Sequence, residues 1–433
     1  MIRTNPLFRS NLALLASVLV ALAAACAPAG ETEDVDADEG AQSEQRPPDL
    51  RPELAQVNDV SVLYPLAKNT DELEGLLSSS AEALGGSLLP KAVYEKAFGA
   101  PGTLQTGGTP AAPPHAGLRV VAARFDPCFG AIGPTNDATC VNQIRLIFQT
   151  VKVDTGADDT AIHAFYTLSR EALKDAVQEV IAVRRARSDE RLGALAPHPL
   201  IESEGLRGAT AKAISAVITK HAGAANLSRF TVFTTSGLGT AWNFTGFDIS
   251  PSGDVVRAPI ANVPGGAPMV AFFAGFRPGE LSGEPPFTPA ATGAKPEDDM
   301  QVLGNGAWVA RSSVSAEKRQ AAFDATFRIE NPNLHSPDTI DCASCHAAEP
   351  ARRIVGEGKL GLTLKDRRAA FVASTEFVPA ADMKLTSIDT SGIDVHMFSY
   401  KGKVASIHPR TVNESAAVVA YLNANVLDAR RPR

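Results

Sequence analysis

The sequence is poor in cysteine, in large aromatic side chains and in positive charge. Its 433 residues include five cysteines, two tryptophans and 6% aromatic residues in total, and the formal net charge is −7. Five cysteines are too few for a small disulfide-rich scaffold. The negative net charge argues against a nucleic-acid partner, because nucleic-acid-binding surfaces are usually basic.

Common catalytic motifs are missing from the central part of the chain. Between Asn58 and Glu330 the sequence contains no G-x-S-x-G, no H-E-x-x-H and no G-x-G-x-x-G motif. These motifs mark α/β-hydrolases, zinc peptidases and dinucleotide-binding enzymes, respectively. The sequence therefore leaves open whether the protein is an enzyme.

The first 25 residues predict an export signal. Arg3 and Arg9 precede an apolar run of 14 residues, 12–25, which is shorter than the roughly 20 residues of a membrane span. Three alanines directly before Cys26 complete a pattern that resembles a bacterial lipoprotein signal, although position 23 is Ala where Leu is commoner. The resemblance implies cleavage before Cys26 and lipidation of this residue. The alternative is an ordinary secretory signal in which Cys26 is incidental.

The next segment, residues 26–57, predicts a disordered tether. Its stretch from Glu31 to Glu53 holds nine acidic residues and two arginines, and it cannot bury enough apolar surface to fold. A cation-binding tract is the alternative. Because Ala27 rather than Asp follows Cys26, the lipoprotein resemblance favours the outer membrane. We therefore expect a protein of the cell envelope, held to the membrane through a lipid anchor.

Residues 58–328 predict an α+β domain whose role the sequence does not indicate. Apolar residues at helical spacing predict helices over 158–187, which would include His163, and over 209–221. Segments rich in Val, Ile and Phe predict strands over residues 118–125, 143–153, 229–235, 241–249 and 269–274.

Cys128 and Cys140 lie on either side of a short loop between two predicted strands. In an exported protein two such cysteines are expected to form a disulfide. A redox-active dithiol is the alternative, and nothing nearby in the sequence lowers the pKa of a thiol.

Cys342, Cys345 and His346 form a C-x-x-C-H motif, the attachment signature of a c-type haem. Two thiols three residues apart lie on one side of a helical turn and can add to the two vinyl groups of one porphyrin. His346 can then place a ring nitrogen on the iron as the proximal ligand. Export supports this prediction, because haem c is attached outside the cytoplasm.

Two other uses of this motif remain open. Zinc could be held by Cys342, Cys345, His346 and His335, since a structural zinc site needs four ligands. The two cysteines could instead form a disulfide of the thioredoxin type, but the βαβ pattern that accompanies such a motif is not visible here.

Residues 329–433 resemble a small single-haem cytochrome c domain. The resemblance rests on the C-x-x-C-H motif near the start and on an amphipathic closing helix, Asn413–Val426. It implies a small, mainly α-helical domain with one haem c and a methionine as sixth ligand, for which Met397 is preferred. His396 and His335 are the alternatives, with His408 a further candidate. The intervening basic segment, residues 350–370, departs from the family because it lacks the usual ligand loop.

The sequence thus predicts an α+β body joined to a C-terminal cytochrome c-like domain, in which one covalent haem transfers single electrons to an unidentified redox partner. A haem enzyme or gas sensor with an open sixth position is an alternative, and so is a lipoprotein in which a zinc or disulfide knot replaces haem. The combination of lipoprotein signal, cysteine pair and haem motif also resembles a set of large lipoproteins from deltaproteobacteria such as myxobacteria. That resemblance implies lineage and no particular activity.

Overall fold

A computed structural model describes most of the chain beyond its N-terminal segment. The predicted signal peptide, Cys26, most of the predicted tether and Cys140 lie outside the described residues. The described ranges are 54–99, 113–128, 141–236, 241–258, 269–273, 276–277, 280–281, 287–288, 296–304, 314–337, 339–387 and 394–427. None of the helices within these ranges is both long enough and apolar enough to cross a bilayer.

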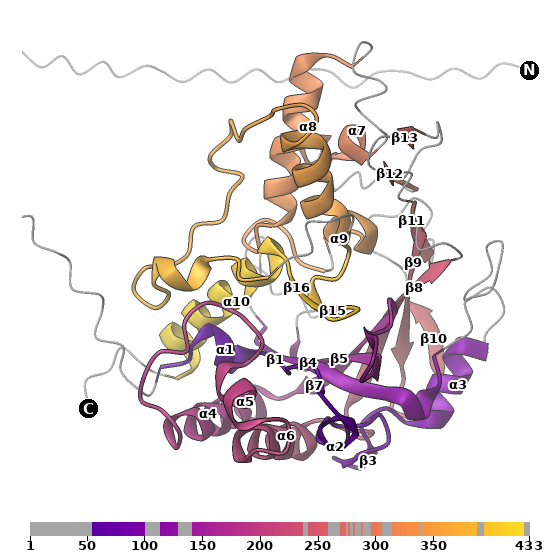
Figure 1. Ribbon diagram of the computed structural model, residues 1–433, viewed down its shortest axis with the longest axis vertical. Helices are drawn as coiled ribbons and strands as arrows, with labels where there is room; N and C mark the ends of the chain where they lie inside the picture. The colour runs from indigo at the N-terminus through magenta and orange to yellow at the C-terminus, as the bar shows by residue number, and fades with distance from the viewer. Residues whose placement is uncertain are drawn as a thin grey trace, which may run out of the picture. The chain divides into compact units, whose positions relative to one another are not determined.

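The centre of the fold is a large antiparallel sheet (Figure 1). Its strands are β1 (Ser61–Leu63), β4 (Leu118–Asp126), β5 (Asn142–Lys152), β6 (Gly156–Ala157), β7 (Ala161–Leu168), β8 (Leu227–Ser236), β9 (Ala241–Ile249), β10 (Val255–Ala258), β11 (Met269–Phe273) and β14 (Phe287–Thr288). Their order is β1-β4-β5-β7-β8-β9-β11-β14, with β6 paired to β5 and β10 paired to β9.

Helices and short hairpins surround this sheet. The helices are α1 (Val57–Val60), α2 (Thr70–Leu73), α3 (Lys91–Gly99), α4 (Arg170–Arg185), α5 (Pro199–Glu204), α6 (Ala209–His221), α7 (Gln301–Gly304), α8 (Ala316–Ile329), α9 (Cys342–Pro350) and α10 (Pro409–Tyr421). The hairpins are β2 (Glu82–Ala83) with β3 (Gly86–Ser87), β12 (Phe276–Arg277) with β13 (Glu280–Leu281), and β15 (Phe398–Lys401) with β16 (Val404–Ile407). Single turns of 3-10 helix lie at His115–Gly117, Pro296–Asp298 and Ala380–Met383, and π-helical turns extend α9 and α10 over Ala351–Glu357 and Leu422–Val426.

The helix predicted over residues 158–187 is wrong in its first third. Residues 161–168 form strand β7, and α4 begins only at Arg170, after Ser169 accepts a hydrogen bond from the backbone N–H of Ala172. Three side chains of β7 are fully buried at alternate positions, as a strand requires: Ile162, Ala164 and Tyr166. His163 therefore lies on the opposite face of the sheet from these three residues.

One face of the sheet is apolar and is covered by α4 and α6. In Figure 1 these helices lie below the strands, with α5 beside them. The apolar stripe of α4 repeats at three- and four-residue spacing and is buried against β4, β5 and β7. The strand residues on this face include Ile144, Leu146, Phe148, Ile162, Ala164, Tyr166, Phe230, Val232 and Phe247.

The opposite face carries buried polar side chains, and the C-terminal segment covers it. Gln149 on β5 donates to the carbonyl of Tyr400 at 2.8 Å and accepts from its N–H at 2.9 Å. Arg124 on β4 pairs with Glu414 on α10. A Cβ at Gly156 would lie 2.2 Å from the carbonyl oxygen of Gly402, so only glycine permits the hairpin of β15 and β16 to approach β6 this closely.

The expected small helical C-terminal domain is therefore wrong. Every described residue belongs to one compact unit, whose core is the antiparallel sheet. Helix α10 packs against α1 near the other end of the described chain, where Asn423 exchanges two hydrogen bonds with the backbone of Ala55 at 2.9 and 3.0 Å. The C-terminal segment also contributes the strands β15 and β16, and its described chain between Gly361 and Phe398 is largely irregular rather than helical. The physical reason is that the polar sheet face needs hydrogen-bonding partners, which an independent domain would not supply.

We expect Gln149→Leu to lower the free energy of unfolding by about 2–3 kcal/mol, because it leaves the buried N–H and C=O of Tyr400 without partners. Chemical denaturation followed by circular dichroism measures this loss. Gln143→Leu is the matched control, since Gln143 lies on the same strand and has no side-chain hydrogen bond among the described residues. Equal stabilities of the two variants would contradict this role of Gln149.

Candidate functional site

The C-x-x-C-H motif forms the first turn of α9, and Asp341 determines where this helix begins. The Asp341 carboxylate accepts hydrogen bonds from the N–H of Ser344 at 3.0 Å and from the Ser344 hydroxyl at 2.7 Å. The turn places Cys342, Cys345 and His346 on one side of the helix. Cys342 and His346 line a cavity whose other wall is the polar face of the sheet.

A single hydrogen bond orients the His346 ring. Its Nδ1 lies 2.6 Å from the carbonyl oxygen of Val395, which can only accept, so Nδ1 carries the proton and donates it. The lone pair is then on Nε2, the tautomer that metal binding through Nε2 requires. Burial lowers the pKa of His346 to about 4, so the ring is neutral at neutral pH.

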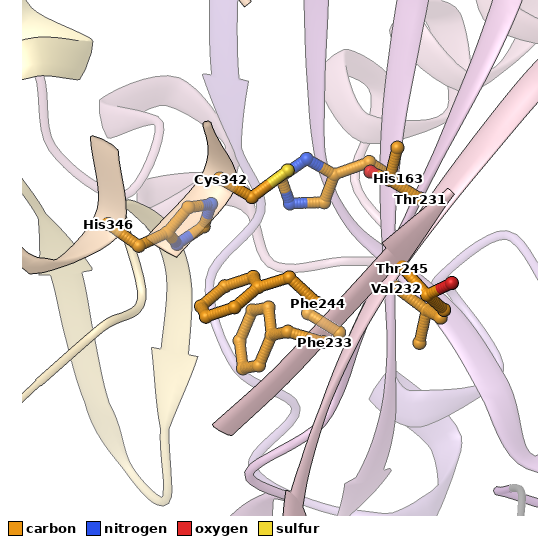
Figure 2. A pocket seen from close by; sticks show the side chains of 9 residues that line it. His163, Thr231, Val232, Phe233, Phe244, Thr245, Cys342 and His346 are labelled. Atoms are coloured by element: carbon orange, nitrogen blue, oxygen red, sulfur yellow. The ribbon is translucent and has the colours of Figure 1, made fainter. Parts of the chain in front are cut away.

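The cavity lies between α9 and the strands β7, β8 and β9, and its volume is about 20 Å³, room for about one water molecule. Figure 2 shows His346, Cys342 and His163 converging on it, with the rings of Phe233 and Phe244 on the adjacent side. The centre of the His346 ring lies 5.7 Å from that of Phe233 and 5.0 Å from that of Phe244. The site thus combines an oriented imidazole with two aromatic side chains that limit the access of water.

The two motif thiols are free. Burial raises the pKa of both the Cys342 and Cys345 thiols to about 12. Their side chains keep some accessible surface, and for Cys342 this surface faces the cavity. Redox-active dithiols and zinc-bound cysteines depend on stabilised thiolates, so this environment does not favour either chemistry. Cys128, in contrast, is disulfide-bonded, while Cys140 lies outside the described residues.

Met397 and His396 lie close to the motif but not across the cavity from His346. The Met397 sulfur lies 4.0 Å from the Cys345 sulfur, two residues after Val395, whose carbonyl holds Nδ1 of His346. The segment that carries Met397 therefore contacts His346 on the side away from Nε2.

His396 is held between two carboxylates. Its Nδ1 lies 2.9 Å from Asp394 and its Nε2 lies 3.2 Å from Asp159. Burial opposes ionisation of Asp394, but the hydrogen bond and charge of His396 outweigh it and lower the Asp394 pKa. At Asp159 burial prevails and raises the pKa, although His396 and Trp242 act against it. Nδ1 of His396 is thus hydrogen-bonded, whereas its buried Nε2, although close to Asp159, has no hydrogen-bond partner among the described residues.

The two remaining candidate histidines lie elsewhere. Nε2 of His335 lies 3.1 Å from the Asp298 carboxylate, and its Nδ1 lies 3.4 Å from the Thr339 hydroxyl. His408 precedes α10 and is fully enclosed, and burial lowers its pKa to about 3. In the part of the chain that the structure describes, no group of three or more His, Cys, Asp or Glu residues is arranged to hold a metal ion. The zinc site with His335 therefore has no structural support.

His163 is a cavity residue that the sequence did not reveal, because its segment is predicted to be a helix. In the structure His163 lies on β7 and its side chain lines the cavity. The centre of its ring lies 6.3 Å from that of His346. The period-two burial of residues 161–168 was the signal that could have placed it. Phe233 and Phe244 were missed as well, because only strand pairing brings them opposite each other.

The side chains present fit a covalent haem in their chemistry. Cys342 and Cys345 can bind the porphyrin, and His346 directs a lone pair into the cavity. In their spacing they do not fit it: the enclosed space is about 20 Å³, whereas typical ligand sites have roughly 300–1,000 Å³. A porphyrin therefore requires α9 and the rings of Phe233 and Phe244 to move apart.

Comparisons with protein families, with characterised proteins and with solved structures gave no match to this chain. The functional argument therefore depends on the sequence motif and the geometry of this site.

Proposed function

We propose that this protein is a lipid-anchored envelope protein that carries one covalent haem c and transfers single electrons. The haem lies between α9 and the sheet of the main body rather than inside a separate cytochrome c-like domain. A lipid on Cys26 anchors the protein to the membrane, and a redox partner protein exchanges electrons with the haem.

The orientation of His346 is the observation that carries this proposal. Its Nδ1–H donates to the Val395 carbonyl, which leaves Nε2 free to bind iron on the cavity side. Metal-bound histidines usually donate their other ring N–H in this way, which fixes the ring and increases its basicity. A histidine that merely filled space would not need this combination with two cysteines on the same turn.

Each surrounding side chain has a defined task. Cys342 and Cys345 would hold the porphyrin, His346 would bind the iron through Nε2, and the rings of Phe233 and Phe244 would shield the group from water. A bound haem would supply one-electron redox chemistry. The apolar rings beside it would lower the local dielectric and so influence its potential.

The proposal predicts covalent haem in a chain that begins after Cys26 and is exported in a host with the c-haem maturation machinery. A denaturing gel stained for haem should show a band at the mass of this shortened chain. The double variant Cys342→Ala and Cys345→Ala should lose the stain completely. Cys128→Ser with Cys140→Ser is the matched control, since it removes the other cysteine pair and should retain the stain.

A second c-type cytochrome expressed in the same cells shows that maturation works. If that protein carries haem while this chain is purified colourless, the cytochrome proposal fails.

The lipid anchor is tested separately with the full-length chain. Growth with a labelled fatty acid should label the wild type and leave Cys26→Ser unlabelled, because acylation requires the new N-terminal cysteine. Cys26→Ser should also move from the membrane fraction to the soluble fraction. An unlabelled wild-type protein would show that the N-terminal segment is an ordinary secretory signal.

A further inference from the structure

The space beside the C-x-x-C-H motif is too small for the group that the motif predicts. The cavity between α9 and strands β7, β8 and β9 has a volume of about 20 Å³, which admits about one water molecule. The thiols of Cys342 and Cys345 are only partly accessible, and burial raises the pKa of both to about 12. In the described arrangement the motif is therefore closed to a porphyrin.

The contacts that hold α9 against the central sheet are mostly apolar. Among the described residues no hydrogen bond or ion pair joins α9 to a strand of this sheet. The His346 ring instead packs against the rings of Phe244 and Phe233, with centres 5.0 and 5.7 Å away (Figure 2). Its Nδ1–H donates to the Val395 carbonyl, which lies outside the sheet. Helix α9 can therefore separate from the sheet without breaking a hydrogen bond to it.

Two imidazole nitrogens beside this interface are enclosed without hydrogen-bond partners among the described residues. They are Nε2 of His396 and Nε2 of His408, and each residue is 1% exposed. The His396 ring packs edge-on against Phe233 with centres 5.0 Å apart. The N–H of His408 donates at 3.0 Å to the carbonyl of Met397, whose sulfur lies 4.0 Å from that of Cys345. Enclosing a polar atom without a partner costs free energy, so the closed arrangement carries a cost that entry of water relieves.

We propose that the haem-free protein exchanges between the described closed state and an open state in which α9 has separated from β8 and β9. The open state exposes Cys342, Cys345 and His346, and it lets water reach the two unpartnered imidazole nitrogens. The sheet and the hairpin of β15 and β16 stay together, because Gln149 holds the backbone of Tyr400. The purpose of this opening rests on the proposed covalent haem: only the open state has room for a porphyrin, so binding shifts the population towards it.

The test is alkylation of the haem-free chain that begins after Cys26, with its motif thiols reduced. Iodoacetamide is added over a series of low urea concentrations, and peptide mass spectrometry gives the reaction rate at Cys342 and at Cys345. Separation of α9 exposes little surface, so both rates should depend only weakly on urea. Rates that rise with urea as steeply as global unfolding, measured by circular dichroism, would overturn the inference.

Phe244→Leu and Phe247→Leu form a matched pair of variants on β9. Phe244 contacts His346, whereas Phe247 is buried on the opposite, apolar face of the same strand. Phe244→Leu should speed alkylation of both cysteines about fivefold, because it weakens the contact that keeps α9 closed. Phe247→Leu should lower the global stability and leave the rates without urea unchanged. Equal rates in the wild type and Phe244→Leu would show that the thiols react in the closed state and would refute the opening of α9.

The haem content of the wild type separates this inference from the proposed function. A wild type that carries covalent haem, while its haem-free form is alkylated only through global unfolding, overturns the opening of α9 and leaves the proposed function standing. A colourless wild type from cells that mature another c-type cytochrome refutes the proposed function, whatever the alkylation rates show.

Discussion

Buried polar groups on one face of the sheet are the constraint on which the rest of this structure depends. Gln149 and Arg124 are buried on strands that the C-terminal segment covers, so each must be satisfied by another part of the chain. Tyr400 and Glu414 of that segment supply the partners. His163, on the same face, is half-buried and lines the cavity instead.

This arrangement explains why the attachment helix and the sheet form one unit. The carbonyl of Val395, which orients His346, lies three residues before β15, and β15 is itself fastened to β5 through Gln149. The position of the His346 ring is therefore tied to the sheet that carries His163.

The sequence predicted what depends on local chemistry and missed what depends on strand pairing. Helix α6 and strand β9 have the predicted bounds, because their apolar patterns are unambiguous over their lengths. The spacing of Cys342 and His346 is likewise readable without a structure. The apolar residues of 162–181 fit helical spacing even though a strand and a helix meet at Ser169, so His163 was assigned to the wrong element. The role of Val395 could not be predicted, since it acts through a backbone carbonyl that every residue type possesses.

The most direct test of the account is a comparison of residues 329–433, exported alone in a host that attaches haem c, with the chain that begins at Pro47. The account predicts that the longer chain unfolds cooperatively and carries covalent haem. The fragment should lack a cooperative transition and the haem spectrum of the longer chain, because it has lost the sheet and Gln149. A fragment that folds cooperatively and shows the same spectrum would contradict the claim that the sheet forms half of the haem site.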